Sequence, residues 1–222
     1  MIEKLKITLW DVLSLWILGV AIIIDFKILT DLKFIPSFAS VPQMLCWENI
    51  PFLVILTYII GALFEPVSNW IFDGSFGVDN LYKKFFFSKM EDESNYFKNN
   101  FQPKLKDMIK KIYDVDLSGS YIYHFAKDYI LENELGTTFM SFLSKYGFYR
   151  SITVLLLFNI VVLLVNVQYS FQHPVIYFSV LLILFFLSLF SYKRAKEFFL
   201  FMGRTVFNNF VIGHREQLKI SQ

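Results

Sequence analysis

The sequence predicts an all-α integral membrane protein with four transmembrane helices and a helical cytoplasmic subdomain. Hydrophobic residues make up 55% of its 222 residues and charged residues 18%, and the mean hydropathy is +0.49. A soluble domain of this size carries about 25% charged residues, so much of this surface must face lipid. A single Cys excludes a disulfide framework, a four-Cys zinc site and an iron–sulfur cluster. The net charge of +2 gives no reason to expect direct nucleic-acid binding.

Four apolar segments are long enough to cross the bilayer, since about 20 residues span roughly 30 Å of hydrocarbon. In chain order they are residues 7–29, 50–72, 151–167 and 174–192. The first also has the position of a signal peptide, but Asp11, Asp25 and the lack of a small-residue cleavage pattern favour a retained helix. The predicted organisation is therefore 1–72 (two spans and an outer loop), 73–148 (cytoplasmic subdomain), 149–192 (a hairpin of two spans) and 193–222 (an aromatic, basic helix and tail).

The distribution of positive charge predicts the orientation. Of the 21 Lys and Arg residues, only Lys27 and Lys33 fall in the two predicted outer loops, residues 27–49 and 168–173. Cytoplasmic flanks of spans carry the excess of positive charge. We therefore expect a multi-pass protein of the bacterial inner membrane with both termini and the central segment in the cytoplasm.

Residues 73–148 have the charge composition and the helix-boundary residues of a helical subdomain. They hold ten Lys and eleven Asp or Glu. A helix is expected over 95–113 with a break at Gln102-Pro103, and others after Ser118-Gly119-Ser120 and after Gly136. After the fourth span, the aromatic stretch 192–210 is expected to continue as a helix that packs on the subdomain, the membrane surface or another subunit. The last dozen residues are expected to be frayed.

A basic helix face lies within this subdomain. Apolar residues recur at helical spacing from Leu105, while lysines fall mainly on the other side. These lysines are Lys104, Lys106, Lys110 and Lys111. One interpretation is attraction to an anionic inner leaflet, at about 1 kcal/mol for each lysine. The alternative is an ordinary amphipathic helix with solvated lysines, which we favour.

Ionisable residues at the inner ends of the spans predict a polar network. Such groups are costly in hydrocarbon and usually face protein or water. The predicted network comprises Asp11, Glu65, Arg150, Lys193 and Arg194. An interhelical network of ion pairs is favoured over a polar vestibule or gate, and a catalytic acid is a third interpretation.

Two asparagines mark one face of the third span. Asn159 and Asn166 are seven residues apart, and such a stripe either links helices by hydrogen bonds or, in an oligomer, lines a pore. The small residues Gly61-Ala62 and Gly19-Val20-Ala21 permit close helix approach.

No catalytic motif supports an enzyme. The chain lacks GxxxxGK[ST], GxGxxG, HExxH and GxSxG, and it contains three His. His124 is expected to pack or hydrogen-bond on its helix. We therefore expect a protein without catalytic residues, cofactor or metal. A lipid-processing enzyme that uses Glu65 and His124 is an alternative.

Three short strings resemble small four-span bacterial proteins. They are Tyr58-Ile59-Ile60-Gly61, Tyr146-Gly147-Phe148-Tyr149-Arg150-Ser151 and Arg194-Ala195-Lys196-Glu197-Phe198-Phe199. The overall layout is similar to that of the membrane accessory proteins of type VI-B CRISPR systems. This resemblance implies an antiviral accessory or effector that works at the inner membrane beside an RNA-guided RNase, and no active-site residues are carried over from it.

These observations lead to one functional expectation and one main alternative. The chain is expected to contact the bilayer, to form a homo-oligomer that alters membrane permeability, and to regulate or meet a cytosolic defence protein. The alternative is a membrane scaffold or inhibitor of a soluble partner, without a pore.

Overall fold

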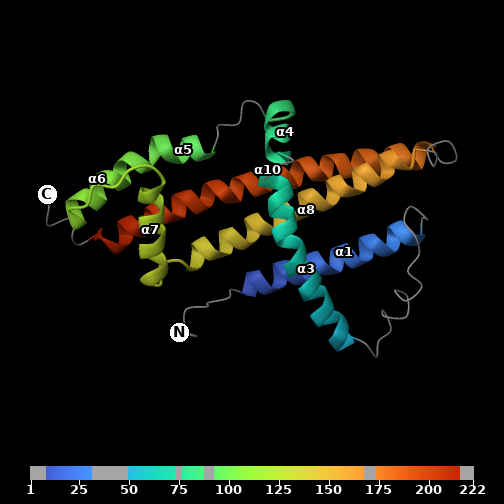
Figure 1. Ribbon diagram of the computed structural model, residues 1–222, viewed down its shortest axis with the longest axis horizontal. Helices are drawn as coiled ribbons and strands as arrows, with labels where there is room; N and C mark the ends of the chain where they lie inside the picture. Colours follow the sequence, from blue (N-terminus) through green and yellow to red (C-terminus); the bar gives the residue numbers. More distant parts are fainter. Residues whose placement is uncertain (1–8, 32–49, 74–76, 88–92, 168–173, 216–222) are drawn as a thin grey trace. The chain divides into compact units, whose positions relative to one another are not determined.

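The structure is a computed structural model that describes residues 9–31, 50–73, 77–87, 93–167 and 174–215 (Figure 1). Every regular element in these residues is an α-helix. Of the predicted outer loop 27–49, residues 27–31 are helical, and residues 32–49 lie outside the described residues, as do the turn 168–173 and the tail end 216–222. The helices are α1 (Leu9–Asp31), α3 (Ile50–Asp73), α4 (Val78–Phe85), α5 (Glu93–Asn100), α6 (Gln102–Tyr113), α7 (Ser120–Glu132), α8 (Thr137–Val165) and α10 (Pro174–Gly213).

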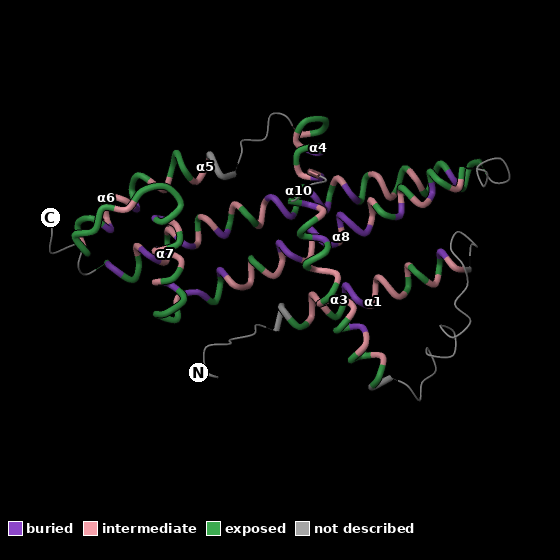
Figure 2. The backbone as a smooth tube through the Cα atoms, in the orientation of Figure 1, coloured by how far each residue is buried: buried purple, intermediate pink, exposed green. Residues whose placement is uncertain are grey.

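Four of these helices, α1, α3, α8 and α10, are long and apolar enough to cross a membrane. This confirms the predicted class, a four-span all-α membrane protein with shorter helices between spans. Large apolar side chains are exposed along the spans, for example Leu63 at 67% and Val175 at 77% (Figure 2). Such surfaces would be a liability in water and are normal against lipid.

The helices α8 and α10 are longer than a bilayer requires. At 1.5 Å per residue, the 40 residues of α10 extend for about 60 Å, which is twice the hydrocarbon thickness. The chain divides into two compact units, residues 1–87 and 147–195, and residues 88–146 and 196–222. We call the first the membrane unit and the second the extramembrane unit, after the locations that we expect for them. Two boundaries between these units fall inside continuous helices. The boundary between residues 146 and 147 lies inside α8, and the boundary between residues 195 and 196 lies inside α10.

Within the membrane unit, two glycines bring α1 and α3 into backbone contact. A Cβ at Gly19 would overlap the Thr57 carbonyl of α3, and a Cβ at Gly61 would overlap the Leu15 carbonyl of α1. Because lipid supplies no hydrophobic force between helices, such close van der Waals packing holds spans together. The close approach expected at Gly19 and Gly61 is therefore present.

The short helix α4 packs with the membrane unit rather than with the rest of residues 73–148. Val78 and Tyr82 are one turn apart on its buried face, and they form a cluster with Phe72, Val154 and Tyr192. The rings of Tyr82 and Tyr192 stack with centroids 4.7 Å apart. The boundary expected at residue 73 thus differs from the compact units by about one short helix.

The extramembrane unit has its own apolar core, to which α6, α7 and α10 contribute. The fully buried apolar side chains that these helices contribute to this unit are Leu105, Ile109, Ile122, Ala126, Ile130, Val206 and Phe210. The break expected at Gln102-Pro103 occurs one residue earlier, at Phe101, because Pro103 lies in the first turn of α6, where its missing N–H is not needed. Helix α7 begins at Ser120, after Gly119, whose positive φ of 60° favours glycine.

The last dozen residues were expected to be frayed, and this expectation is wrong for the first of them. Helix α10 continues to Gly213, and His214 is 2% exposed. Its Nε2 lies 2.7 Å from the Tyr113 hydroxyl, and its Nδ1 lies 2.9 Å from the Phe210 carbonyl. Aromatic packing around the imidazole therefore fastens the end of this helix to α6 and α7.

We expect Gly61→Ala to destabilise the membrane unit by about 1–3 kcal/mol, because its methyl group would collide with the Leu15 backbone, which cannot rotate away. The melting temperature of purified protein in detergent measures the effect. Val67→Ile adds one methylene to an exposed position on the same helix and serves as the control. Equal melting temperatures for both variants and the wild type would contradict the close α1–α3 packing.

Candidate functional site

The central polar feature of the membrane unit is a cluster of Arg150 on α8 with two carboxylates of α3, here called the Arg150 cluster. Arg150 Nη1 lies 3.6 Å from Asp73 Oδ2, and Nη2 lies 4.0 Å from Glu65 Oε1. Glu65 and Asp73 are about two turns apart and therefore share one side of α3. A Cβ at Gly147 would come within 2.6 Å of Glu65 Oε1, so this glycine leaves room for the carboxylate.

Burial in this cluster is asymmetric. The Arg150 side chain is 9% exposed, whereas those of Glu65 and Asp73 are 41% and 44% exposed. A nearly buried cation pays a large desolvation cost that nearby carboxylates offset. The carboxylates retain contact with the exterior, so the net strength of the pairs lies between those of buried and surface ion pairs.

A buried hydrogen bond extends the contact between α3 and α8. The hydroxyls of Ser68 and Ser151 lie 2.6 Å apart, and both residues are fully buried. Since Ser68 donates its proton to the Glu65 carbonyl at 2.7 Å, Ser151 is the donor between the two serines. Small hydroxyl residues commonly link spans in this way. Sequence reasoning missed both serines, and their polarity within apolar segments was the only available signal.

Of the five residues predicted to form the inner polar network, the structure brings Glu65 and Arg150 together and adds Asp73. Lys193 and Arg194 are exposed, and the Arg194 guanidinium lies 5.5 Å from the Phe190 ring centroid on its own helix. Asp11 lies in the first turn of α1, and its side chain is outside the described part of the chain. Asp73 is the last residue of α3, and sequence reasoning did not single it out as part of the network.

The two asparagines of the third span have different surroundings. Asn159 is 7% exposed; its side chain lies near the Asp25 carboxyl of α1 and donates to the Leu155 carbonyl of its own helix at 3.0 Å. Asn166 lies just beyond α8, where its side chain donates to the Val162 carbonyl at 2.8 Å. Asn159 thus lies where α8 faces α1, whereas the Asn166 side chain closes the end of its own helix.

A second set of polar contacts holds α4 in the membrane unit. The Tyr82 hydroxyl donates to Ser188 Oγ at 2.9 Å, and the Tyr192 hydroxyl donates to Asp79 Oδ1 at 2.8 Å. Burial raises the pKa of the Tyr82 hydroxyl above its usual range, and the bond to Ser188 partly offsets this increase. These bonds pair tyrosines of α4 and α10 reciprocally, and sequence reasoning did not find them.

The lysines of α6 face outward while its apolar side packs. Lys104, Lys110 and Lys111 are exposed, whereas Leu105 and Ile109 are fully buried. Lys106 pairs with Asp116 at 2.9 Å, and this hydrogen bond lowers the pKa of the Asp116 carboxyl. The apolar face is therefore used for packing in the extramembrane unit, and attraction of the lysines to an anionic leaflet stays a prediction.

Within the described ranges, no group of three or more His, Cys, Asp or Glu side chains is placed to hold a metal ion. His124 is exposed on α7, and Glu65 is engaged by Arg150. Chemically, the Arg150 cluster is suited to hold two spans together through charge.

We expect Arg150→Gln to destabilise the protein by about 1–2 kcal/mol, less than a fully buried pair would, because both carboxylates retain contact with the exterior. The double variant Glu65→Gln, Asp73→Asn should cost more, since it strips the counter-charges from a nearly buried guanidinium. Melting temperatures in detergent test this order. Lys193→Gln, an exposed position, is the control; a loss for Lys193→Gln as large as that for Arg150→Gln would contradict it.

Comparison with known proteins identifies no relative. No family model matches the chain, and no curated protein or solved structure shows significant similarity to it. The four long apolar helices make it a multi-pass membrane protein, and they identify no family. A finer function must therefore be inferred from the geometry of the chain itself.

Proposed function

We propose that this protein is a non-enzymatic membrane effector whose extramembrane unit controls the packing of the four spans. The observation that carries the proposal is the position of Arg150. It lies three residues beyond the point where α8 passes from the extramembrane unit into the membrane unit. At that point it is held by two carboxylates of another span.

Continuous helices supply the mechanical link. Because α8 and α10 each contribute residues to both units, a rotation or shift at one end of either helix must be transmitted along it or absorbed by bending. The first ion pairs that a movement of α8 would strain are those of Arg150. The cluster then acts as a latch that favours the closed packing of α3 against α8.

Altered permeability is the output that we propose. Opening the latch would separate polar groups that otherwise satisfy each other at the α3–α8 interface, including the serine pair. Unsatisfied polar groups are costly in lipid, so they are stabilised by contact with water or with a second copy of the chain. This favours assembly into a homo-oligomer with a hydrated path. The exposed apolar faces of the spans leave room for that assembly.

The biological setting that we propose is antiviral defence at a bacterial inner membrane, beside a cytosolic RNA-guided RNase. Its support is the resemblance of the three short strings and of the four-span layout to membrane accessory proteins of type VI-B CRISPR systems. The engagement of Glu65 by Arg150 favours this non-enzymatic function over lipid processing by Glu65 and His124.

The latch predicts a gain of permeability. A loss of about 1–2 kcal/mol from the closed state raises the open population about 5- to 30-fold. Arg150→Gln and Glu65→Gln should therefore increase the entry of a membrane-impermeant dye into expressing cells without any trigger, while Lys193→Gln behaves as the wild type. Phage protection measured in the same strains tests the proposed function in antiviral defence. Normal expression with unchanged dye entry would contradict the proposed latch. Co-purification with a soluble partner, without any change in dye entry, would favour the scaffold function.

The orientation that we propose places both termini and residues 88–146 in the cytoplasm, on the basis of positive charge. Single cysteines introduced at Lys98 and Lys111, both exposed in the extramembrane unit, should resist a membrane-impermeant maleimide in intact cells and react after lysis. Cys46 is first replaced by Ser to remove the native thiol. Labelling in intact cells would reverse the orientation.

A further inference from the structure

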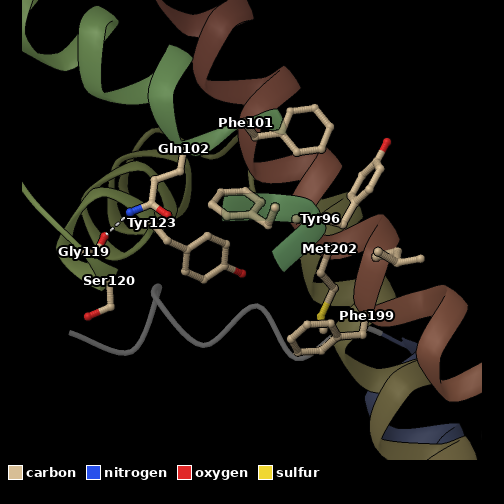
Figure 3. A pocket seen from close by; sticks show the side chains of 11 residues that line it. Tyr96, Phe101, Gln102, Gly119, Ser120, Tyr123, Phe199 and Met202 are labelled. Atoms are coloured by element: carbon tan, nitrogen blue, oxygen red, sulfur yellow. Dashed lines mark hydrogen bonds between the residues drawn. The ribbon is translucent and has the colours of Figure 1, made fainter. Parts of the chain in front are cut away.

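The extramembrane unit contains a cavity of about 180 Å³ between α5, the start of α7 and α10 (Figure 3). All the residues that line it belong to this one unit. An apolar cavity of about 150 Å³ is large enough to bind benzene. The size of this cavity therefore suits one planar ring or a small fused pair of rings.

The walls of the cavity are mainly aromatic. The rings of Phe97 and Tyr123 meet edge to face with centroids 5.1 Å apart, and Tyr96 and Phe101 meet in the same way at 5.7 Å. A Cβ at Gly203 would lie 3.0 Å from the Phe97 ring, so this glycine lets the ring lie against α10. Such rings offer both faces and edges to a further aromatic ring.

One side of the cavity is polar. Gln102 Nε2 donates to the Gly119 carbonyl at 2.8 Å, a bond that fixes the amide and leaves its oxygen as an acceptor. Gly119 holds the left-handed φ of 60° that turns the chain there. Figure 3 shows the Tyr123 hydroxyl directed into the space between the Gln102 side and Met202.

The Tyr123 hydroxyl stays neutral over the physiological range. Burial raises its pKa to about 12, and within the described residues no hydrogen-bond partner of this hydroxyl is found. It is therefore available as a donor to a molecule in the cavity. A chain of methylene groups would leave this donor and the Gln102 acceptor without partners, which disfavours an acyl chain.

We propose that this cavity is a binding site for a small, neutral, planar aromatic molecule that carries a hydrogen-bonding group at one edge. The aromatic walls would hold the ring, while the Tyr123 hydroxyl and the Gln102 amide oxygen would bind its polar edge. No charged side chain lines the cavity within the described part of the chain, so a charged ligand would be desolvated without compensation. The site does not depend on the proposed effector function.

The test uses the full chain in lipid nanodiscs, with phenol as the probe and saturation-transfer NMR as the readout. The phenol hydroxyl can accept from Tyr123 and donate to Gln102. Empty nanodiscs give the signal from phenol in lipid, which is subtracted. We expect saturable binding with a Kd below about 1 mM, no binding of benzoate, and weaker binding of 1-octanol. Absence of saturable phenol binding, or preference for benzoate or octanol, would overturn the proposed ligand class.

Variants locate the binding. Tyr123→Phe removes only the hydroxyl and should weaken phenol binding about five- to tenfold, whereas Tyr121→Phe, at a 71% exposed tyrosine on the same helix, should leave it unchanged. Leu200→Trp fills the cavity from α10 and should abolish binding. Unchanged affinity in both Tyr123→Phe and Leu200→Trp would show that phenol binds elsewhere. Far-UV circular dichroism and melting temperature verify that each variant is folded.

Discussion

The thickness of the bilayer is the constraint on which the rest of the structure depends. Hydrocarbon accommodates about 20 helical residues, and every backbone group inside it must be satisfied within a helix. Helix α10, with 40 residues, therefore cannot be only a span, and its far half must find other partners. It finds them in an aromatic core that reaches Phe210 and His214. The helix α10 thus contributes both to membrane anchoring and to the extramembrane fold.

Different forces hold the two units together. In the membrane unit, glycines allow backbones to touch, and isolated polar bonds such as Ser68–Ser151 join helices that have little hydrophobic reason to associate. In the extramembrane unit, water drives apolar burial, so Leu105, Ile109 and Ile130 form an ordinary core. Substitutions should therefore act through overpacking and lost polar bonds in the membrane unit, and through cavities in the other.

Sequence reasoning predicted the features that depend on local pattern. Runs of apolar residues gave the four spans, and Gly119 and Pro103 gave the helix boundaries to within about a residue. It placed Glu65 and Arg150 at similar depth, and they do meet. Asp73 was missed because its role depends on a partner 77 positions away along the chain. Helix α4 and His214 were missed for the same reason, since each is stabilised by contacts that no local periodicity records.

The latch that we propose at Arg150 rests on the position of the charged residues. An ion pair deep in hydrocarbon would be too costly to break and remake, whereas a pair in open water would contribute too little to hold a state. Arg150 is nearly buried, but its carboxylate partners are more than two-fifths exposed, so only the cationic side of each pair is enclosed by protein. A contact of this intermediate kind can separate two packings by a few kcal/mol, which is the range in which a modest stimulus shifts populations.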